Sequence, residues 1–355
     1  MNYLTLILTN DCNQNCSYCY QMRSSSKMQF STAKTAIDFL SSIHTQVPII
    51  RFYGGEPFLE YELMQQVITY CGIAFPKDQQ PKYSVTTNGL LLREDILSYC
   101  NNKGFEIYLS IDGNKRAHEC GRGKGSFEKI QAVINLIKSL PHIFLKTYSV
   151  ITPQNVKYLC ESIDFLIGIG AQELCFSFQL DCEWESEALQ MLKNNFKEAL
   201  FKLCKYRSQG GKVYIEGLNP RPSGIFFVHC NPGEDRVTVT TEGYVYGCSM
   251  HIPWSVRAME SNTTESLSSL CFGHINNLNR AKLNDKLNML SSDKRLSGQY
   301  SRYTAKKKCS QCEYIQQCAV CPIISLINSE DPFLIPEWVC EIKQIIFKTS
   351  SVLKE

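Results

Sequence analysis

The chain has 355 residues, of which 44% are hydrophobic and 20% charged, so it is long enough for one large domain plus a smaller one. Its 37 basic and 34 acidic side chains give a formal net charge of +3, which is too small to draw in nucleic acid by charge alone. The first nine residues, MNYLTLILT, lack the basic segment of a signal peptide, and no apolar run approaches the roughly 18 residues of a membrane span. We therefore expect a cytoplasmic protein that binds neither nucleic acid nor a membrane.

Apolar runs rich in β-branched and aromatic residues alternate with longer amphipathic stretches along the first part of the chain. The expected strands are residues 3–8, 49–53, 83–86, 105–111, 144–151 and 173–179. The expected helices are residues 32–44, 61–73, 94–102, 126–140, 154–168 and 185–208. Six strand–helix units in series predict a parallel sheet with helices outside it, and they are fewer than the eight that close a full barrel. The predicted fold is α/β, an open, partial (β/α)6 barrel of the TIM type.

The pattern changes after the last of these helices. Residues 210–224, GGKVYIEGLNPRPSG, are dense in glycine and proline and predict a linker or long loop. Residues 236–247 alternate around Glu242 and Gly243 as a hairpin does. The remainder is rich in cysteine and has too little periodicity for a large core. We expect a barrel domain over residues 1–214 and a small cysteine-rich domain over residues 215–355.

Polar or glycine-rich turns follow the first four expected strands: TNDC at residue 9, GGEP at 54, TTNG at 86 and SIDG at 110. Ligands of parallel sheets gather at the carboxyl ends of the strands, so four such turns on one edge predict a site.

Cysteine is the unusual component, with 18 residues. In a long chain without an export signal, metal or redox chemistry is favoured over a disulfide framework. The thiols also cluster, with Cys12, Cys16 and Cys19 near the start and five more between residues 309 and 340. A closed tetrahedral site needs four protein ligands, so three thiols indicate a metal centre with one position left open. Zinc is the alternative at this loop, although no fourth Cys or His lies close by in the sequence.

The spacing Cys12-x-x-x-Cys16-x-x-Cys19, with Tyr18 before the last cysteine, resembles the signature of the radical SAM superfamily. The resemblance implies a [4Fe–4S] cluster whose fourth iron chelates S-adenosylmethionine (SAM). It also implies an external electron donor such as flavodoxin or ferredoxin, and cleavage of SAM to a 5′-deoxyadenosyl radical.

The same resemblance implies contacts to SAM from the strand-end turns. The implied cofactor-binding residues are Tyr18, Gly54, Gly55, Glu56, Asn88, Ser110, Asp112 and Arg122. The alternative for Ser110 and Asp112 is an ordinary turn closed by local side-chain hydrogen bonds.

The C-terminal cysteines resemble the SPASM extension of radical SAM enzymes, which carries two auxiliary [4Fe–4S] clusters. The implied ligands are Cys309, Cys312, Cys318 and Cys340 for the second auxiliary cluster, and Cys230, Cys248 and Cys321 for the first. Residues 221–229 lack the cysteine that often completes the first cluster. The alternatives are an open iron, a fourth ligand from His229, Cys271 or a substrate atom, and a cluster that is incomplete or of a different type. A zinc ribbon is the alternative for the two C-x-x-C pairs.

The SPASM resemblance implies an oxidoreductase that modifies a peptide or protein. Ser249 stands where the sulfatase maturases of this group have a catalytic aspartate, and a serine is not a ready general base. The leading hypothesis is a maturase of a ribosomally made precursor peptide, forming an oxidative crosslink or thioether. The alternatives are a peptide epimerase, a formylglycine-forming sulfatase maturase, and a non-enzymatic electron carrier or zinc-stabilised adaptor.

Two further expectations concern hydrogen donors and partners. Cys175, in the sixth strand, and Cys182, just past it, are candidate donors of a hydrogen atom to a substrate radical. The chain begins directly with the first strand, so leader-peptide recognition would fall to a separate protein.

Overall fold

The computed structural model describes residues 1–215, 235–250, 252, 271–292, 307–314, 318, 324–325, 328 and 334–352. The strands are β1 (Tyr3–Thr9), β2 (Ile49–Gly54), β3 (Lys82–Thr87), β4 (Glu106–Ser110), β5 (Phe144–Ile151), β6 (Glu173–Phe178), β7 (Lys212–Ile215), β8 (Arg236–Val239), β9 (Tyr244–Tyr246) and β10 (Cys271–His274). The α-helices are α1 (Phe30–Ile43), α2 (Tyr61–Ala74), α3 (Glu94–Asn102), α4 (Lys115–Arg122), α5 (Ser126–Ile137), α6 (Leu159–Gly168), α7 (Ser186–Ser208), α10 (Arg280–Ser292), α12 (Lys307–Ser310) and α14 (Glu337–Val352).

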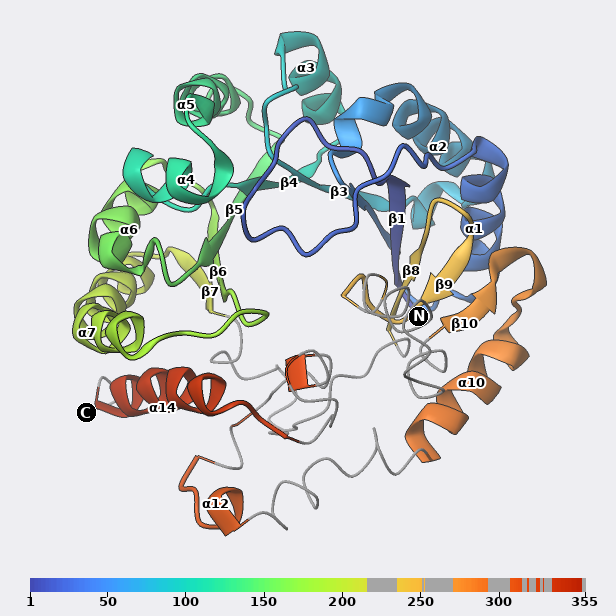
Figure 1. Cartoon of the computed structure of the whole chain (residues 1–355). Coiled ribbons are helices and arrows are strands. Elements are labelled where there is room, and N and C mark those ends of the chain that lie inside the picture. The colour runs from blue at the N-terminus through green and yellow to red at the C-terminus, as the bar shows by residue number, and fades with distance from the viewer. Residues whose placement is uncertain are drawn as a thin grey trace.

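Within these residues all the strands form one sheet, in the order β10-β9-β8-β1-β2-β3-β4-β5-β6-β7. Neighbours from β8 to β7 in this order are parallel, and β9 and β10 are antiparallel additions beside β8. Figure 1 shows α1 to α7 around the outside of the curved sheet, with the loop between β1 and α1 crossing the mouth of the barrel. The predicted α/β partial barrel is confirmed.

The predicted strands and helices are confirmed with small differences. Each of β1 to β6 agrees with its predicted range to within one residue at either end. Helix α6 begins only at Leu159, because a short 3-10 turn at Val156–Tyr158 precedes it. The sequence reading did not anticipate α4, which begins after Asn114, whose side chain accepts a hydrogen bond from the Ala117 N–H at 3.0 Å.

The alternation of side chains along each strand divides the sheet into two faces. On β2, Ile50 and Phe52 are fully buried in the core under the helices. Burying side chains of this size stabilises the fold by about 1.5–3 kcal/mol each. Arg51 and Tyr53, which alternate with them, belong to the concave face, as the contact of Arg51 with Tyr108 of β4 confirms. The concave face is therefore polar, and the core lies between sheet and helices.

The region from residue 212 onward continues the same sheet. β7 pairs with β6, and β8 pairs with β1 on the opposite side. The hairpin predicted around Gly243 is confirmed, because β8 and β9 pair antiparallel and Gly243 has a positive φ of 91°. Helix α14 packs against α7 and buries Val339, Ile342 and Ile346, so this region has more apolar packing than its sequence indicated. The boundary near residue 215 stays a prediction.

Among the described residues, no helix combines the length and the apolar character that crossing a membrane requires.

Candidate functional site

The cysteine loop, residues 10–28, follows β1 and is fixed at both its base and its far side. Thr9 and Lys27 close the base as an antiparallel bridge. On the far side, the Ser17 N–H donates to the Gly121 carbonyl of α4 at 2.8 Å. The barrel therefore holds the loop over the ends of its strands, as Figure 1 shows.

The three thiols of this loop differ in their surroundings. The Sγ of Cys12 accepts hydrogen bonds from the Gln14 N–H at 3.4 Å and from the Asn88 amide at 3.7 Å. Burial raises the pKa of Cys12 and of Cys16, whereas Cys19 is exposed. Burial alone thus disfavours the thiolate form, which a bound metal would favour by its own positive charge.

The glycine turn after β2 lies directly against the backbone of this loop. The N–H groups of Gly55 and Glu56 donate to the carbonyls of Thr9 and Asp11, both at 2.9 Å. A Cβ on Gly55 would lie 2.0 Å from the Asp11 oxygen. Glycine is therefore required here for close packing of the chain against itself.

Glu56 joins the turn after β2 to the turn after β3. Its carboxylate accepts hydrogen bonds from the Thr87 hydroxyl at 2.8 Å, the Asn88 N–H at 2.8 Å and the Phe58 N–H at 3.2 Å. Burial raises the pKa of Glu56 to about 7, against the effect of these donors. The residue is fully buried, so its observed role is to position Asn88.

Tyr18, Asp112 and Arg122 form a buried unit. Arg122 binds the Asp112 carboxylate through Nε at 3.0 Å and Nη2 at 2.9 Å, and the Tyr18 hydroxyl donates to the same carboxylate. The Val150 N–H adds a further bond at 3.0 Å. The Tyr18 ring lies against Gly121, where a Cβ would come within 2.4 Å of it. These contacts dock the cysteine loop onto α4 and β5.

A cavity below the cysteine loop collects most of the remaining predicted residues. It is lined by Asn10, Cys12, Gln14, Cys16, Cys19, Gln21, Arg23, Tyr53, Gly54, Gly55, Thr86, Thr87, Asn88 and Ser110. The three thiols, both glycines, Asn88 and Ser110 are thus brought together. Tyr18, Glu56, Asp112 and Arg122 do not line the cavity, and the structure places them behind it. Their contact with SAM stays a proposal.

The donor set at this cavity fits an iron–sulfur cluster. No group of three or more His, Cys, Asp or Glu side chains within the described residues is arranged to hold a single ion. Thiolates that bind different irons of one cubane lie further apart than ligands of one ion, and here three thiols line one cavity. Cys12, Cys16 and Cys19 would hold such a cluster, and it would supply one-electron chemistry to SAM.

The four cysteines predicted for the second auxiliary cluster also lie near one another. Cys309, Cys312 and Cys340 all act electrostatically on Cys318. Burial raises the pKa of Cys318 to about 11, and nearby Lys343 opposes this effect. These four thiols would suit a thiolate-bound cluster, and their role as ligands stays a proposal.

The predicted first auxiliary set is described only in part. Cys230, Cys321 and His229 lie outside the described residues. Cys248 lies two residues after the end of β9, and Cys271 begins the neighbouring strand β10. Both are partly buried.

Two tyrosines connect the cysteine loop with Cys248. The Tyr20 and Tyr53 hydroxyls form a hydrogen bond of 2.8 Å. Tyr20 also hydrogen-bonds the Ser249 side chain and lies within the electrostatic reach of Cys248. Burial raises the pKa of both phenols, so each is neutral at pH 7. The region of Cys248 therefore adjoins the cavity that the first three thiols line.

The two candidate hydrogen donors lie outside that lining. Cys175 is buried on β6 next to Glu173, and burial raises its pKa to about 12. Cys182 is half-buried in the loop after β6, and burial raises its pKa to about 11. Both are protonated thiols at pH 7, and their catalytic role stays a proposal.

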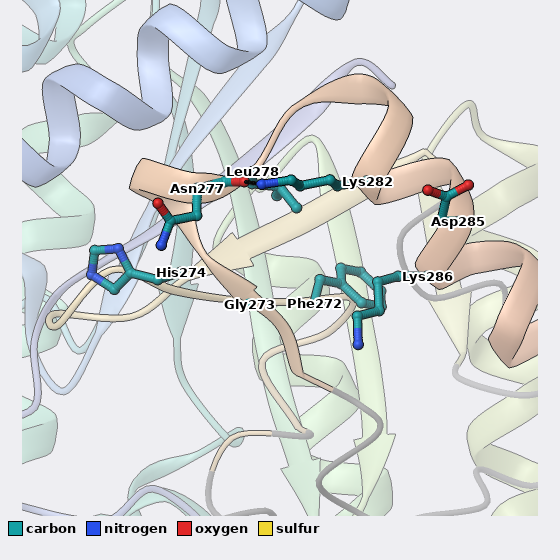
Figure 2. A pocket seen from close by; sticks show the side chains of 8 residues that line it. All are labelled: Phe272, Gly273, His274, Asn277, Leu278, Lys282, Asp285 and Lys286. Carbon is teal, nitrogen blue, oxygen red and sulfur yellow. Dashed lines mark hydrogen bonds between the residues drawn. The ribbon is translucent and has the colours of Figure 1, made fainter.

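A second cavity, of about 370 Å³, lies between β10 and α10 (Figure 2). Its lining includes Lys282, Asp285 and Lys286, and the Lys282 ammonium donates to the Asn277 carbonyl at 2.8 Å. It contains no thiol, so it does not suit an iron–sulfur cluster.

Several lining residues were missed at the sequence level. These are Gln14, Gln21, Arg23 and Tyr53. The side-chain amide of Gln14 donates a hydrogen bond to the Arg122 carbonyl at 3.2 Å. The signal for Tyr53 was its alternation with the buried residues of β2. Nothing distinguished Gln21 and Arg23 from other polar loop residues.

Comparison with known proteins assigns the family. Residues 6–166 match the model of the radical SAM superfamily. The chain is 32% identical over 289 residues to the uncharacterized protein MJ0907 of Methanocaldococcus jannaschii, covering 80% of this chain and 92% of that protein. It is 25% identical over 255 residues to the sporulation killing factor maturation protein SkfB of Bacillus subtilis, covering 69% and 60%.

Solved structures agree on the fold. Native anSMEcpe with bound AdoMet superimposes with a TM-score of 0.77 at 18% identity, covering 99% of this chain and 98% of that one. Streptococcus suis SuiB bound to the precursor peptide SuiA gives a TM-score of 0.64 at 15% identity, covering 95% and 75%. Because the matched region contains the three-thiol loop, the glycine turn and the strand ends that surround them, this chain belongs to the radical SAM superfamily of enzymes.

Proposed function

We propose that this enzyme is a maturase that oxidatively modifies a residue of a ribosomally made peptide, by crosslink or thioether formation. The observation that carries the proposal is the junction between the two thiol-bearing regions. Tyr20 joins Tyr53, in the lining of the first cavity, to Ser249 and Cys248. A redox centre at Cys248 would therefore adjoin the place where a substrate meets SAM.

This placement favours net oxidation over other outcomes. A substrate that loses a hydrogen atom must lose one more electron to reach an oxidised product, and an adjacent auxiliary cluster is suited to accept it. Soft sulfur ligands also suit an open iron, so a substrate thiolate is a candidate fourth ligand beside Cys248. Ser249 occupies a neutral hydrogen-bonded position, which supports a reaction without a carboxylate base there.

The relatives support a peptide substrate. SkfB is named as a maturation protein, and SuiB is bound to a precursor peptide in its structure. In this chain, the residues of the cavity would orient SAM and the peptide. The Asn88 amide bonds the Cys12 thiol, and the Glu56 carboxylate fixes the Asn88 backbone.

The test searches the neighbouring genes for a short precursor peptide, coexpresses a candidate with this enzyme and analyses the peptide by mass spectrometry. A loss of two hydrogens supports oxidation. A peptide mass that is unchanged in ordinary water but increases by one deuterium in heavy water points to epimerisation. Cys175 and Cys182 would then be the candidate hydrogen donors. Formylglycine in a sulfatase peptide would contradict the argument from Ser249. The matched control replaces Cys12, Cys16 and Cys19 with alanine, and it must leave the peptide unmodified.

A further inference from the structure

The concave face of the barrel carries more positive than negative charge among the described residues. Its basic side chains are Arg51, Lys82, Lys146, Lys212 and Arg236, and its acidic ones are Glu106 and Glu173. Lys146 bonds both carboxylates, at 3.3 Å to Glu106 and 3.0 Å to Glu173. The two acids are therefore engaged on β4, β5 and β6, away from β2.

The basic residues of this face other than Lys146 make no ion pair within the described residues, and of these only Arg51 of β2 is not solvent-exposed. Its guanidinium lies between two rings, with its carbon 4.2 Å from the centroid of Tyr108 and 5.6 Å from that of Tyr3. Its Nε is buried and has no hydrogen-bond partner, and no ion pair to Arg51 occurs within the described part of the chain.

The contacts with the two rings do not compensate for leaving the buried Nε–H of Arg51 without an acceptor. Cation–π contacts contribute about 0.5–2 kcal/mol each, whereas a buried donor left without an acceptor costs about 1–3 kcal/mol, and more when it is charged. Arg51 as a whole is only partly buried, but its Nε is buried, and buried N–H donors in proteins are paired as a rule. The arrangement keeps the guanidinium fixed in orientation and leaves part of its hydrogen-bonding capacity free for an anion.

The position of Arg51 relates it to the candidate site. It lies two residues before Tyr53, about 7 Å along the strand, and Tyr53 lines the cavity of the three thiols. On this face Tyr148 of β5 is 36% exposed, and it pairs in register with Ser110 of the cavity lining, so the concave face is open to solvent beside the thiol end of the strands. A substrate segment that enters there and extends back along the concave face would reach Arg51, two residues below Tyr53 of the cavity lining.

We propose that Arg51 is a specificity-determining residue that binds a carboxylate of the substrate inside the barrel. The carboxylate is either an Asp or Glu side chain or the C-terminus of a peptide. Planar guanidinium binds carboxylate through two parallel hydrogen bonds, which fixes orientation as well as charge. This inference rests on the proposed function only in taking the substrate to be a peptide. A small-molecule carboxylate would bind the same Arg51 guanidinium.

The experiment uses the full chain with its clusters, in the wild type and the Arg51→Gln variant. Arg236→Gln is the matched control, because Arg236 lies over the same Tyr3 ring at 5.6 Å but is solvent-exposed. A degenerate peptide library is passed over each immobilised protein with SAM, and the retained peptides are sequenced. One retained peptide is then resynthesised with each acid replaced by its amide, and separately with an amidated C-terminus.

The wild type and Arg236→Gln should enrich carboxylate-bearing peptides. One of the two neutralised peptides should bind them about 10- to 100-fold more weakly, the range for loss of one charged hydrogen-bonded pair. In Arg51→Gln the same neutralisation should have no effect, and Arg51→Lys should fall between because it keeps the charge without the fork. Equal effects of neutralisation in wild type and Arg51→Gln would overturn the proposal.

Two measurements separate this proposal from other failures. Iron content and SAM cleavage without peptide must be unchanged in Arg51→Gln; a selective loss of SAM cleavage would assign Arg51 to SAM instead and overturn the proposal. If the wild type retains no peptide, the peptide function fails, and Arg51 is tested with about 100 mM propionate against propionamide in thermal unfolding. Stabilisation by propionate that is lost only in Arg51→Gln supports the carboxylate site, and no difference between the variants refutes it.

Discussion

Replacing Asp112 with asparagine distinguishes a structural role for this carboxylate from direct binding of SAM. The side chain is completely buried and receives hydrogen bonds from Arg122 at 2.9 and 3.0 Å and from the Val150 N–H at 3.0 Å. Asparagine has nearly the same shape, but it removes the negative charge and directs an amide N–H at one of these donors.

The expected loss in the free energy of unfolding follows from the unpaired charge that remains in the Asp112→Asn variant. Arg122, whose side chain is only 7% exposed, would keep its charge without a counter-ion. Burial alone would lower the pKa of Arg122. The ordinary pKa of arginine lies so far above 7 that the guanidinium keeps its proton even without Asp112. Breaking one partner of a buried ion pair costs about 3–5 kcal/mol in the free energy of unfolding.

The control is Asp164→Asn, which makes the same chemical change in the exposed pair of Asp164 and Lys202, with an N–O distance of 2.5 Å. That variant should change stability by less than about 1 kcal/mol. Urea unfolding of the cluster-free chains, followed by circular dichroism, measures both. Asp112→Asn should also incorporate less iron at the first site, because Tyr18 loses its acceptor. Normal stability combined with weaker SAM binding would refute the structural role and restore Asp112 as a cofactor contact.

Three further predictions concern the same region. Alanine at Cys12, Cys16 and Cys19 together should abolish SAM cleavage and lower the iron content, measured after anaerobic reconstitution, by about four from about twelve per chain; stoichiometric zinc with little iron would contradict the cluster assignment. Gly55→Ala places a Cβ 2.0 Å from the Asp11 oxygen and should weaken SAM binding about 10- to 100-fold by calorimetry, whereas Gly72→Ala, with open space around it, should not. Burial, with a smaller contribution from Arg122, lowers the pKa of His118 to about 4. As the pH falls from about 6.5, His118 therefore becomes protonated in the unfolded chain before it does in the folded one. The free energy of unfolding should decrease by about 3 kcal/mol between about pH 6.5 and 4. His118→Leu should remove that slope in urea titrations of the cluster-free chain, and an unchanged slope would show that another group causes it.

The barrel was predictable because its strands and helices each carry a local signal. The buried residues of β2 alternate with polar ones, and the helices repeat their apolar residues at helical spacing, so pattern alone located them. The same holds for the cysteine loop, whose three thiols and following turns lie within short segments.

The side-chain partners were not predictable, because they depend on which segments the fold brings together. Asp112 and Arg122 bind each other, which their sequence spacing did not indicate. Their expected contact with SAM stays a prediction. Helix α4 escaped notice because it has only eight residues, although Asn114 is a good N-cap. Strand β7 lies inside the segment that the sequence predicts as a linker, because four residues between glycines and prolines carry little periodic signal.

Tyr53 occupies the point where the three parts of the proposed reaction meet. Its ring lines the cavity of the thiols, its hydroxyl bonds Tyr20 near Cys248, and Arg51 lies two residues before it and lowers its pKa against the larger effect of burial. A carboxylate held by Arg51 would therefore lie below Tyr53, while SAM would lie above it. A substrate residue can then reach SAM only if it lies a short distance along the peptide from that carboxylate. The separation between Arg51 and the thiol cavity would therefore select both a charged substrate and the residue that is modified.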